Sequence, residues 1–196
     1  MIKYWFYFIQ YYFSTLFNIV WFKNTTVEKL YRADMFALLM HHKITQRYDG
    51  KPYFYHVKDV ALNACMYKDL LQNEEEMYLT YVGALLHDAI EDCNLTYNDI
   101  KATWGVEIAE IVYACTELRG KNRKERHGQE YIDTLVASRL GTFVKLCDIL
   151  SNVHRSFTTG HRMLNAYKKE FPKVKEQLYR EEFDIIFSDI EKYLSK

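Results

Sequence analysis

Residues 78–90 read YLTYVGALLHDAI, an apolar run that ends in a histidine and an aspartate before the last two apolar positions. A helix that is apolar on all sides lies in the interior of its domain. An ionised aspartate at the end of such a helix is costly to bury unless it is paired or binds a metal. Glu91 and Asp92 lie one helical turn beyond His87 and Asp88. The run therefore predicts a buried helix that brings four polar side chains to one place.

A second buried run is interrupted in the same way. Residues 143–150 read FVKLCDIL, in which Asp148 breaks the apolar stripe, and Asn152 follows one turn later. Residues one turn apart on a helix lie close enough to interact. This segment therefore predicts another buried helix with an inward carboxylate and a polar partner beside it.

The helix predicted between about residues 25 and 43 supplies a third polar intrusion. Its adjacent histidines, His41 and His42, point about 100° apart around the helix axis. His42 continues a face of apolar side chains spaced three or four residues apart, whereas His41 does not. We therefore expect His42, rather than His41, to point into the domain. The apolar face in question consists of Tyr31, Met35, Leu38 and Leu39.

Two histidines and two aspartates form the mixed nitrogen and oxygen ligand set that suits manganese, iron or zinc. A single buried histidine is more often a hydrogen-bonded core residue. Three separate intrusions, each with a polar partner one turn away, favour a metal site instead.

Composition limits the fold and the class of function. The chain has 196 residues, of which 49% are hydrophobic, and only seven glycines and two prolines. With no alternating apolar pattern, these features predict a single all-α, compact multi-helix domain. The formal net charge of zero removes the simplest argument for nucleic-acid binding. Four widely spaced cysteines predict free thiols and a cytoplasmic location.

The N-terminal segment, residues 1–24, is unlike the rest. It holds an uncharged, aromatic-rich stretch from Tyr4 to Phe22 with one lysine on either side. As an extra hydrophobic helix this stretch would span about 28 Å, close to the thickness of a bilayer core. A stripe of polar residues, formed by Gln10, Ser14 and Asn18, favours docking on the domain or on a second subunit. Membrane contact by residues 4–22 and docking, including homo-oligomer formation, both stay open.

Two segments that carry these polar residues resemble motifs of metal-dependent HD phosphohydrolases. They are LLHDAIED (85–92) and VKLCDILSN (144–152). Upstream, residues 42–56 are similar to the H-x-x-x-x-R-x-x-G-x-P-Y-x-x-H segment of RelA/SpoT-type (p)ppGpp hydrolase domains. The resemblance extends from about residue 30 to 175 and is closest to small stand-alone alarmone hydrolases. It implies that residues 25–196 form an HD-domain helix bundle.

The resemblance also implies roles for individual residues. It gives His42, His87, Asp88 and Asp148 as ligands of one divalent metal, usually manganese, and His56 as a hydrogen-bonding residue of the pocket. Glu91 and Asp92 match the pair that positions and activates water. The expected substrate-binding residues are Arg47, Tyr53, Lys121, Arg123, Lys124, Lys145, Asn152 and Tyr167.

The implied reaction is hydrolysis of the 3′-pyrophosphate of guanosine tetra- or pentaphosphate to GDP or GTP and pyrophosphate. An alternative keeps the metal chemistry but acts on a dNTP, a nucleoside monophosphate or NADPH. A third hypothesis is a non-catalytic, membrane-tethered or oligomeric binding protein that uses the aromatic N-terminus. Ser151, where the family more often has histidine, leaves the choice of nucleotide open.

Overall fold

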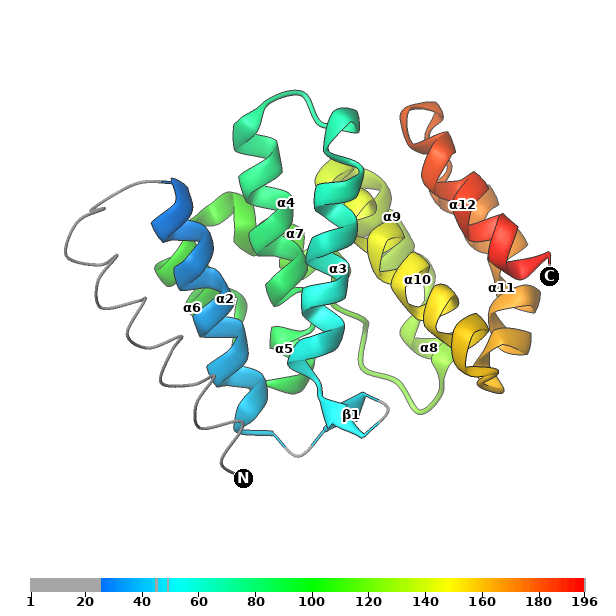
Figure 1. The fold of residues 1–196 in the computed structure, drawn as a ribbon, viewed down its shortest axis with the longest axis horizontal. Coiled ribbons are helices and arrows are strands. Elements are labelled where there is room, and N and C mark those ends of the chain that lie inside the picture. Colours follow the sequence, from blue (N-terminus) through cyan, green and yellow to red (C-terminus); the bar gives the residue numbers. More distant parts are fainter. Residues whose placement is uncertain (1–25, 45, 49, 196) are drawn as a thin grey trace.

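The computed structural model describes residues 26–44, 46–48 and 50–195, with the side chains of Arg123 and Lys124 left out (Figure 1). The hydrophobic segment 1–24 lies outside the described residues, so its docking or membrane contact stays a prediction. Within the described ranges, no helix is both long and apolar enough to cross a membrane.

Helices make up most of the described chain and strands almost none of it, which confirms the all-α prediction. A two-residue antiparallel hairpin, β1 (Arg47–Tyr48) with β2 (Lys51–Pro52), interrupts them near the N-terminal end. Two short 3₁₀ helices, η1 (Lys68–Leu70) and η2 (Glu181–Phe183), join longer elements. The α-helices are α2 (Thr26–His42), α3 (Phe54–Met66), α4 (Glu74–Leu86), α5 (Ala89–Asp92), α6 (Tyr97–Trp104), α7 (Val106–Cys115), α8 (Arg123–Arg126), α9 (Gln129–Ala137), α10 (Arg139–Thr159), α11 (Met163–Leu178) and α12 (Asp184–Leu194).

Helix α4 forms the centre of the bundle, as its apolar sequence predicts. Every residue from Leu79 to Leu86 is buried, and the helix packs against α2, α3, α7 and α10. Gly83 permits the close approach of α7, because a Cβ atom there would lie 2.6 Å from Ile111 Cγ2. The helix ends earlier than expected, at Leu86, and a short turn precedes α5. That turn holds His87 and Asp88 at the C-terminal end of the central helix.

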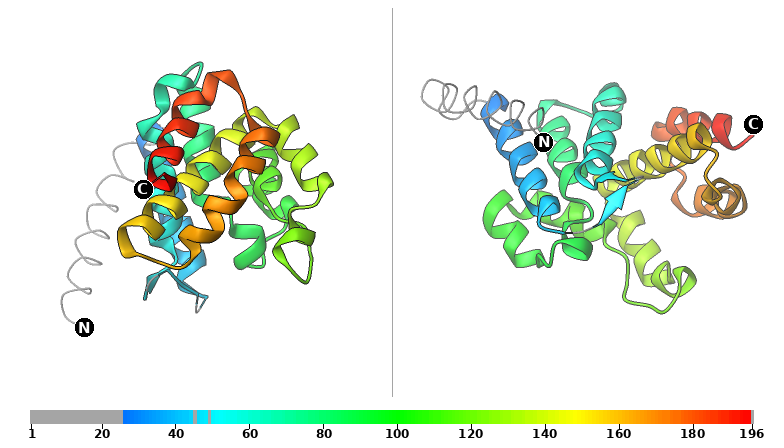
Figure 2. Two further views of the ribbon diagram at one scale, coloured as in Figure 1. Left: turned by 90° about the vertical axis from the view of Figure 1, so that its right-hand side faces the viewer. Right: turned by 60° about the horizontal axis from the view of Figure 1, so that its bottom comes forward.

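Helix α10, at 21 residues, crosses the bundle and joins its two sides. It packs against α3, α4 and α7 on one side and against α11 and α12 on the other (Figure 2). Gly160, with φ of 64°, ends it in the left-handed conformation that glycine adopts readily. Because α10 runs past the ends of α3 and α4, Asp148 lies next to residues that are far away in sequence.

Local hydrogen bonds set the boundaries of α6, whereas a proline lies inside α11. Thr96 and Asp99 form a capping box at the start of α6, and Gly105 ends that helix. Pro172 lies inside α11 rather than at its first turn. Phe171 and Leu178 are both buried on that helix, so tertiary packing keeps it continuous although proline removes one backbone hydrogen bond.

Candidate active site

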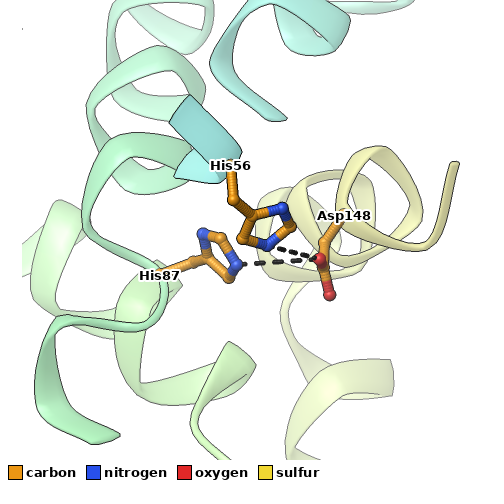
Figure 3. Close-up of side chains that lie close together, drawn as sticks. All are labelled: His56, His87 and Asp148. Atoms are coloured by element: carbon orange, nitrogen blue, oxygen red, sulfur yellow. Dashed lines mark ion pairs between the residues drawn. The ribbon is translucent and has the colours of Figure 1, made fainter. Parts of the chain in front are cut away.

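Three helical elements bring His56, His87 and Asp148 together in the interior (Figure 3). One ligand atom from each side chain lies within 4.8 Å of the others, and all three residues are buried. His56 Nε2 is 3.2 Å and His87 Nε2 is 3.8 Å from Asp148 Oδ1. Both imidazole rings therefore direct their Nε2 atoms at the Asp148 carboxylate.

Asp88 adds a fourth group to this cluster. Its Oδ2 atom lies 3.1 Å from His87 Nε2 and 3.7 Å from His56 Nε2. Tyr53 donates a hydrogen bond of 2.6 Å from its hydroxyl to the same Asp88 oxygen. This bond fixes the orientation of the carboxylate toward the two histidines.

The cluster fits a divalent cation. His87 Nδ1 lies 2.7 Å from the carbonyl oxygen of Ala84, to which it donates, so Nε2 is directed at the two carboxylates. That Nε2 is buried and has no hydrogen-bond partner among the described residues. A neutral imidazole whose other nitrogen is held by a carbonyl is the usual form of a histidine that binds a metal. His56, His87 and Asp148, with Asp88 beside them, could therefore hold a divalent metal.

The charges of the site favour a cation at its centre. Burial alone would raise the pKa of both carboxyls, but His87 next to Asp88 and Lys145 next to Asp148 lower those pKa values below the usual range. Burial would likewise lower the pKa of His87, yet Asp88 and Asp148 raise it to about 9, so its Nε2 carries a proton at neutral pH that a bound metal ion would replace. Both aspartates are thus ionised and stabilise positive charge between them.

Two polar residues of α10 hold Asp148 in place. Lys145 donates from Nζ to Oδ2 at 2.9 Å, and Asn152 donates from Nδ2 to Oδ1 at 2.6 Å. Tyr48, from the hairpin, donates its hydroxyl to the Asn152 oxygen at 3.2 Å. The partner one turn after Asp148, expected from the sequence, therefore restrains this carboxylate and links it to the hairpin.

The expected orientation of the two adjacent histidines is wrong. His41 is fully buried, whereas His42 is exposed and does not join the cluster. The small residues Ala33 and Ala37 form the inward face of α2 with His41, because they let the helix approach α4 closely. The larger residues on the expected face lie at the border: Tyr31, Met35 and Leu38 are half-buried and Leu39 is exposed.

His56 occupies the place expected for His42. Its helix buries Val60 and Ala64 at one-turn intervals beyond His56, on the same stripe. That periodicity could have identified His56 as an inward residue, since it is visible in the sequence. The resemblance had suggested only a pocket hydrogen-bonding role for this side chain.

The burial of His41 predicts a loss of stability in mild acid. Burial lowers the pKa of His41 from 6.5 to about 4. Because the unfolded chain binds the proton more readily than the folded protein, protonation of this imidazole favours unfolding. The free energy of unfolding is therefore highest above pH 6.5 and falls as the pH drops from 6.5 to about 4. The loss amounts to roughly 3 kcal/mol if the unfolded chain titrates normally.

Chemical denaturation at several pH values can isolate this contribution. We expect His41→Leu to flatten the decline in the free energy of unfolding between pH 6.5 and pH 4. His42→Leu is the matched control, because it changes the exposed neighbour, and should leave the pH dependence as in the wild type. Parallel curves for His41→Leu and the wild type would contradict the expectation.

A cleft of about 880 Å³ opens from the metal cluster to the surface between α9, α10 and α11. Of the expected substrate-binding residues, Tyr53, Lys145, Asn152 and Tyr167 lie in its wall. Arg47 and Lys121 are exposed and lie outside the lining found for the described chain. Expected contacts by Arg123 and Lys124 concern side chains outside the described part. The cleft wall also includes Arg126 from the basic segment 119–127. It further includes three residues that sequence reasoning did not single out as pocket residues, namely His127, Lys169 and Lys173.

Glu91 and Asp92 line the cleft beside the cluster. The side chain of Glu91 is exposed to the cleft, and partial desolvation by the protein around its carboxylate raises its pKa to about 7. Burial raises the pKa of Asp92 to about 6, and the Asp88 charge adds to the effect. Carboxyls that titrate near neutral pH can accept and return protons under ordinary conditions.

The chain matches a known protein family and has relatives of known name. A family model described as "HD domain" matches residues 53–185. A protein of Aquifex aeolicus named guanosine-3′,5′-bis(diphosphate) 3′-pyrophosphohydrolase is 33% identical over 129 residues, which cover 64% of this chain and 17% of that protein. Guanosine-3′,5′-bis(diphosphate) 3′-pyrophosphohydrolase MESH1 of Danio rerio is 31% identical over 107 residues, 54% of this chain and 56% of that protein.

A solved structure shows the same fold. It is described as a metazoan ortholog of SpoT that hydrolyzes ppGpp and plays a role in starvation responses. It superposes with a TM-score of 0.65 at 20% sequence identity and covers 84% of this chain and 94% of its own. The chain therefore matches most of that protein's fold, but it spans only part of the length of the two sequence relatives named above.

Proposed function

The chain belongs to the HD-domain family, and on that basis we propose that it hydrolyses the 3′-pyrophosphate of guanosine tetra- and pentaphosphate, releasing GDP or GTP and pyrophosphate. The central observation is the buried cluster of His56, His87, Asp88 and Asp148 at the inner end of a cleft. Relatives named as 3′-pyrophosphohydrolases of guanosine bis(diphosphate) support the choice of substrate.

The four residues of the cluster would hold one divalent ion, for which we propose manganese. Mixed imidazole and carboxylate ligands suit this metal. When bound, such an ion supplies Lewis-acid chemistry, which lowers the pKa of water and stabilises negative charge on phosphoryl oxygens.

Free thiols at all four cysteines agree with a reducing, cytoplasmic location.

The remaining steps belong to side chains of the cleft. Glu91 or Asp92 takes a proton from the attacking water and returns it to the leaving oxygen, since both carboxyls titrate near neutrality. Positive charge for the pyrophosphate comes from Lys145 near the cluster, and Lys169 and Lys173 add cations on the α11 wall. Tyr167, also in the cleft wall, offers an aromatic surface on which the nucleobase stacks.

The two carboxyls predict how the rate depends on pH. A general base works only when it is deprotonated, so a raised pKa shifts the loss of activity to a higher pH. We expect kcat/KM to fall as the pH drops below about 7, with a midpoint between the values for Glu91 and Asp92, about 7 and about 6. A pH–rate profile measured at constant ionic strength tests this. A rate that stays flat down to pH 5 would exclude both carboxyls as the base.

The reaction itself is tested by incubating the protein with guanosine tetraphosphate and manganese and resolving the products by ion-exchange chromatography. The proposal predicts equal amounts of GDP and pyrophosphate. Turnover of a dNTP, a nucleoside monophosphate or NADPH, without turnover of guanosine tetraphosphate, would replace the substrate but keep the metal chemistry. No turnover of any of them would favour the non-catalytic binding protein.

A further inference from the structure

Glu117 links two parts of the cleft that are separate in sequence. It lies in the segment between α7 and α8, and its side chain is 16% exposed. Its backbone N–H donates a hydrogen bond of 2.7 Å to Glu91 Oε1. Its own carboxylate binds His127 through Oε1 at 2.6 Å and Arg126 through Oε2 at 3.0 Å.

The bond from the Glu117 amide acts on a proposed proton-transfer group. A general base must be held within hydrogen-bond reach of the proton that it removes. The amide fixes one carboxylate oxygen of Glu91 and leaves the other available to the cleft. It also favours the ionised form, since a hydrogen bond to a carboxylate lowers its pKa.

The two bonds from the Glu117 carboxylate act on the cleft wall. Arg126 and His127 are the residues at the end of the basic 119–127 segment that line the cleft. Leu118 closes the segment by donating its N–H to the carbonyl of Arg126 at 3.2 Å, and His127 stacks on Tyr131 with ring centroids 5.4 Å apart. The end of the 119–127 loop that lies next to Glu117 is thus held in place.

We propose that Glu117 is a positioning residue for the reaction proposed above, on which this inference rests. Its amide orients Glu91, and its carboxylate fixes the loop wall at Arg126 and His127. Because a single residue makes both sets of contacts, loosening the loop also moves the amide away from Glu91. The position of the 119–127 loop and the orientation of Glu91, the proposed general base, are therefore coupled.

Glu117→Gln tests the coupling, because glutamine keeps the size but loses the negative charge to which Arg126 and His127 bind. In the manganese-loaded protein we expect kcat to fall roughly tenfold to a hundredfold, the effect of a small misplacement of reacting groups. KM for guanosine tetraphosphate should stay unchanged or fall, since a negative charge has left a cleft that binds a polyanion. An unchanged kcat with a lower KM would show that Glu117 acts through charge alone and would overturn the proposal.

Glu125→Gln is the matched control in the same loop. Glu125 bonds only to the neighbouring loop residues Lys121 and Asn122 in the described contacts, so the same change of charge should leave kcat within about twofold of the wild type. A double-mutant cycle gives the second control. In the Glu91→Gln background, Glu117→Gln should cost little further activity, whereas independent losses that multiply would contradict an action through Glu91.

Hydrogen exchange provides a readout that needs no substrate. Amides of residues 118–128 should exchange faster in Glu117→Gln than in the wild type, and Glu125→Gln should not reproduce this at residues 117 and 118. Unchanged exchange would overturn the anchoring role. If the wild type fails to hydrolyse guanosine tetraphosphate while the exchange changes as expected, the proposed function fails and the anchoring role stands.

Discussion

Asp148→Asn is expected to abolish both metal binding and pyrophosphate release. Asp148 is the carboxylate toward which both cluster histidines point, and its side chain is 8% exposed. Asparagine keeps the shape but removes the charge that stabilises a cation in this buried position. We expect metal content to fall to background by elemental analysis, and the rate to fall by at least roughly a hundredfold.

Loss of the Asp148 charge also leaves Lys145 without its partner at 2.9 Å, so the variant must be shown to fold. Asp189→Asn is the matched control, since it makes the same chemical change on α12, where Asp189 accepts a hydrogen bond from Tyr67. The control should keep its metal and its rate. Wild-type activity in a folded Asp148→Asn protein would contradict the assignment of the metal site.

His56→Leu is expected to have an effect of similar size, whereas His42→Leu is expected to have almost none. His56 is 2% exposed and lies 3.2 Å from Asp148, while His42 is exposed to solvent. Leucine fills a volume close to that of the ring but offers no metal ligand. We expect His56→Leu to lose the metal and at least roughly a hundredfold in rate.

The pair of histidine variants distinguishes two ligand sets. The sequence motif favours His42, and the geometry of the fold favours His56. Both variants should first be compared with the wild type by thermal unfolding, so that a rate change is not mistaken for misfolding. Loss of metal in His42→Leu with normal metal in His56→Leu would contradict the geometry described above.

Sequence periodicity predicts the fold well wherever one helix face is unambiguous. The run around Gly83 is apolar on every side, so its place at the centre follows from composition alone. Thr96 and Gly105 likewise act through local hydrogen bonds and backbone conformation, which do not depend on distant residues. His87 and Asp148 follow from the same reasoning, because each interrupts a long apolar run.

The orientation of α2 could not be obtained in this way. That helix has two apolar faces, one of large residues that include Met35 and one that includes Ala33 and Ala37. Which face lies inward depends on how closely α4 approaches, and this is decided by the partner helix. The error over His42 follows from choosing the face with the larger side chains.

The cleft wall depends even more on tertiary structure. Lys173 on α11 reaches the cleft because α10 carries the C-terminal helices past the cluster, and Arg126 on α8 lies there bound to Glu117. The bond between Glu117 and Glu91 joins residues 26 positions apart, and no local spacing indicates it. Residues of this kind become visible only once the packing of the helices is known.

The account depends most directly on where the metal binds. Crystals of the protein soaked in manganese, with diffraction measured at the manganese absorption edge, would locate the ion by its anomalous signal. We predict one dominant peak enclosed by His56, His87, Asp88 and Asp148, with no comparable peak at His42. A dominant peak away from these four side chains would contradict the proposed centre.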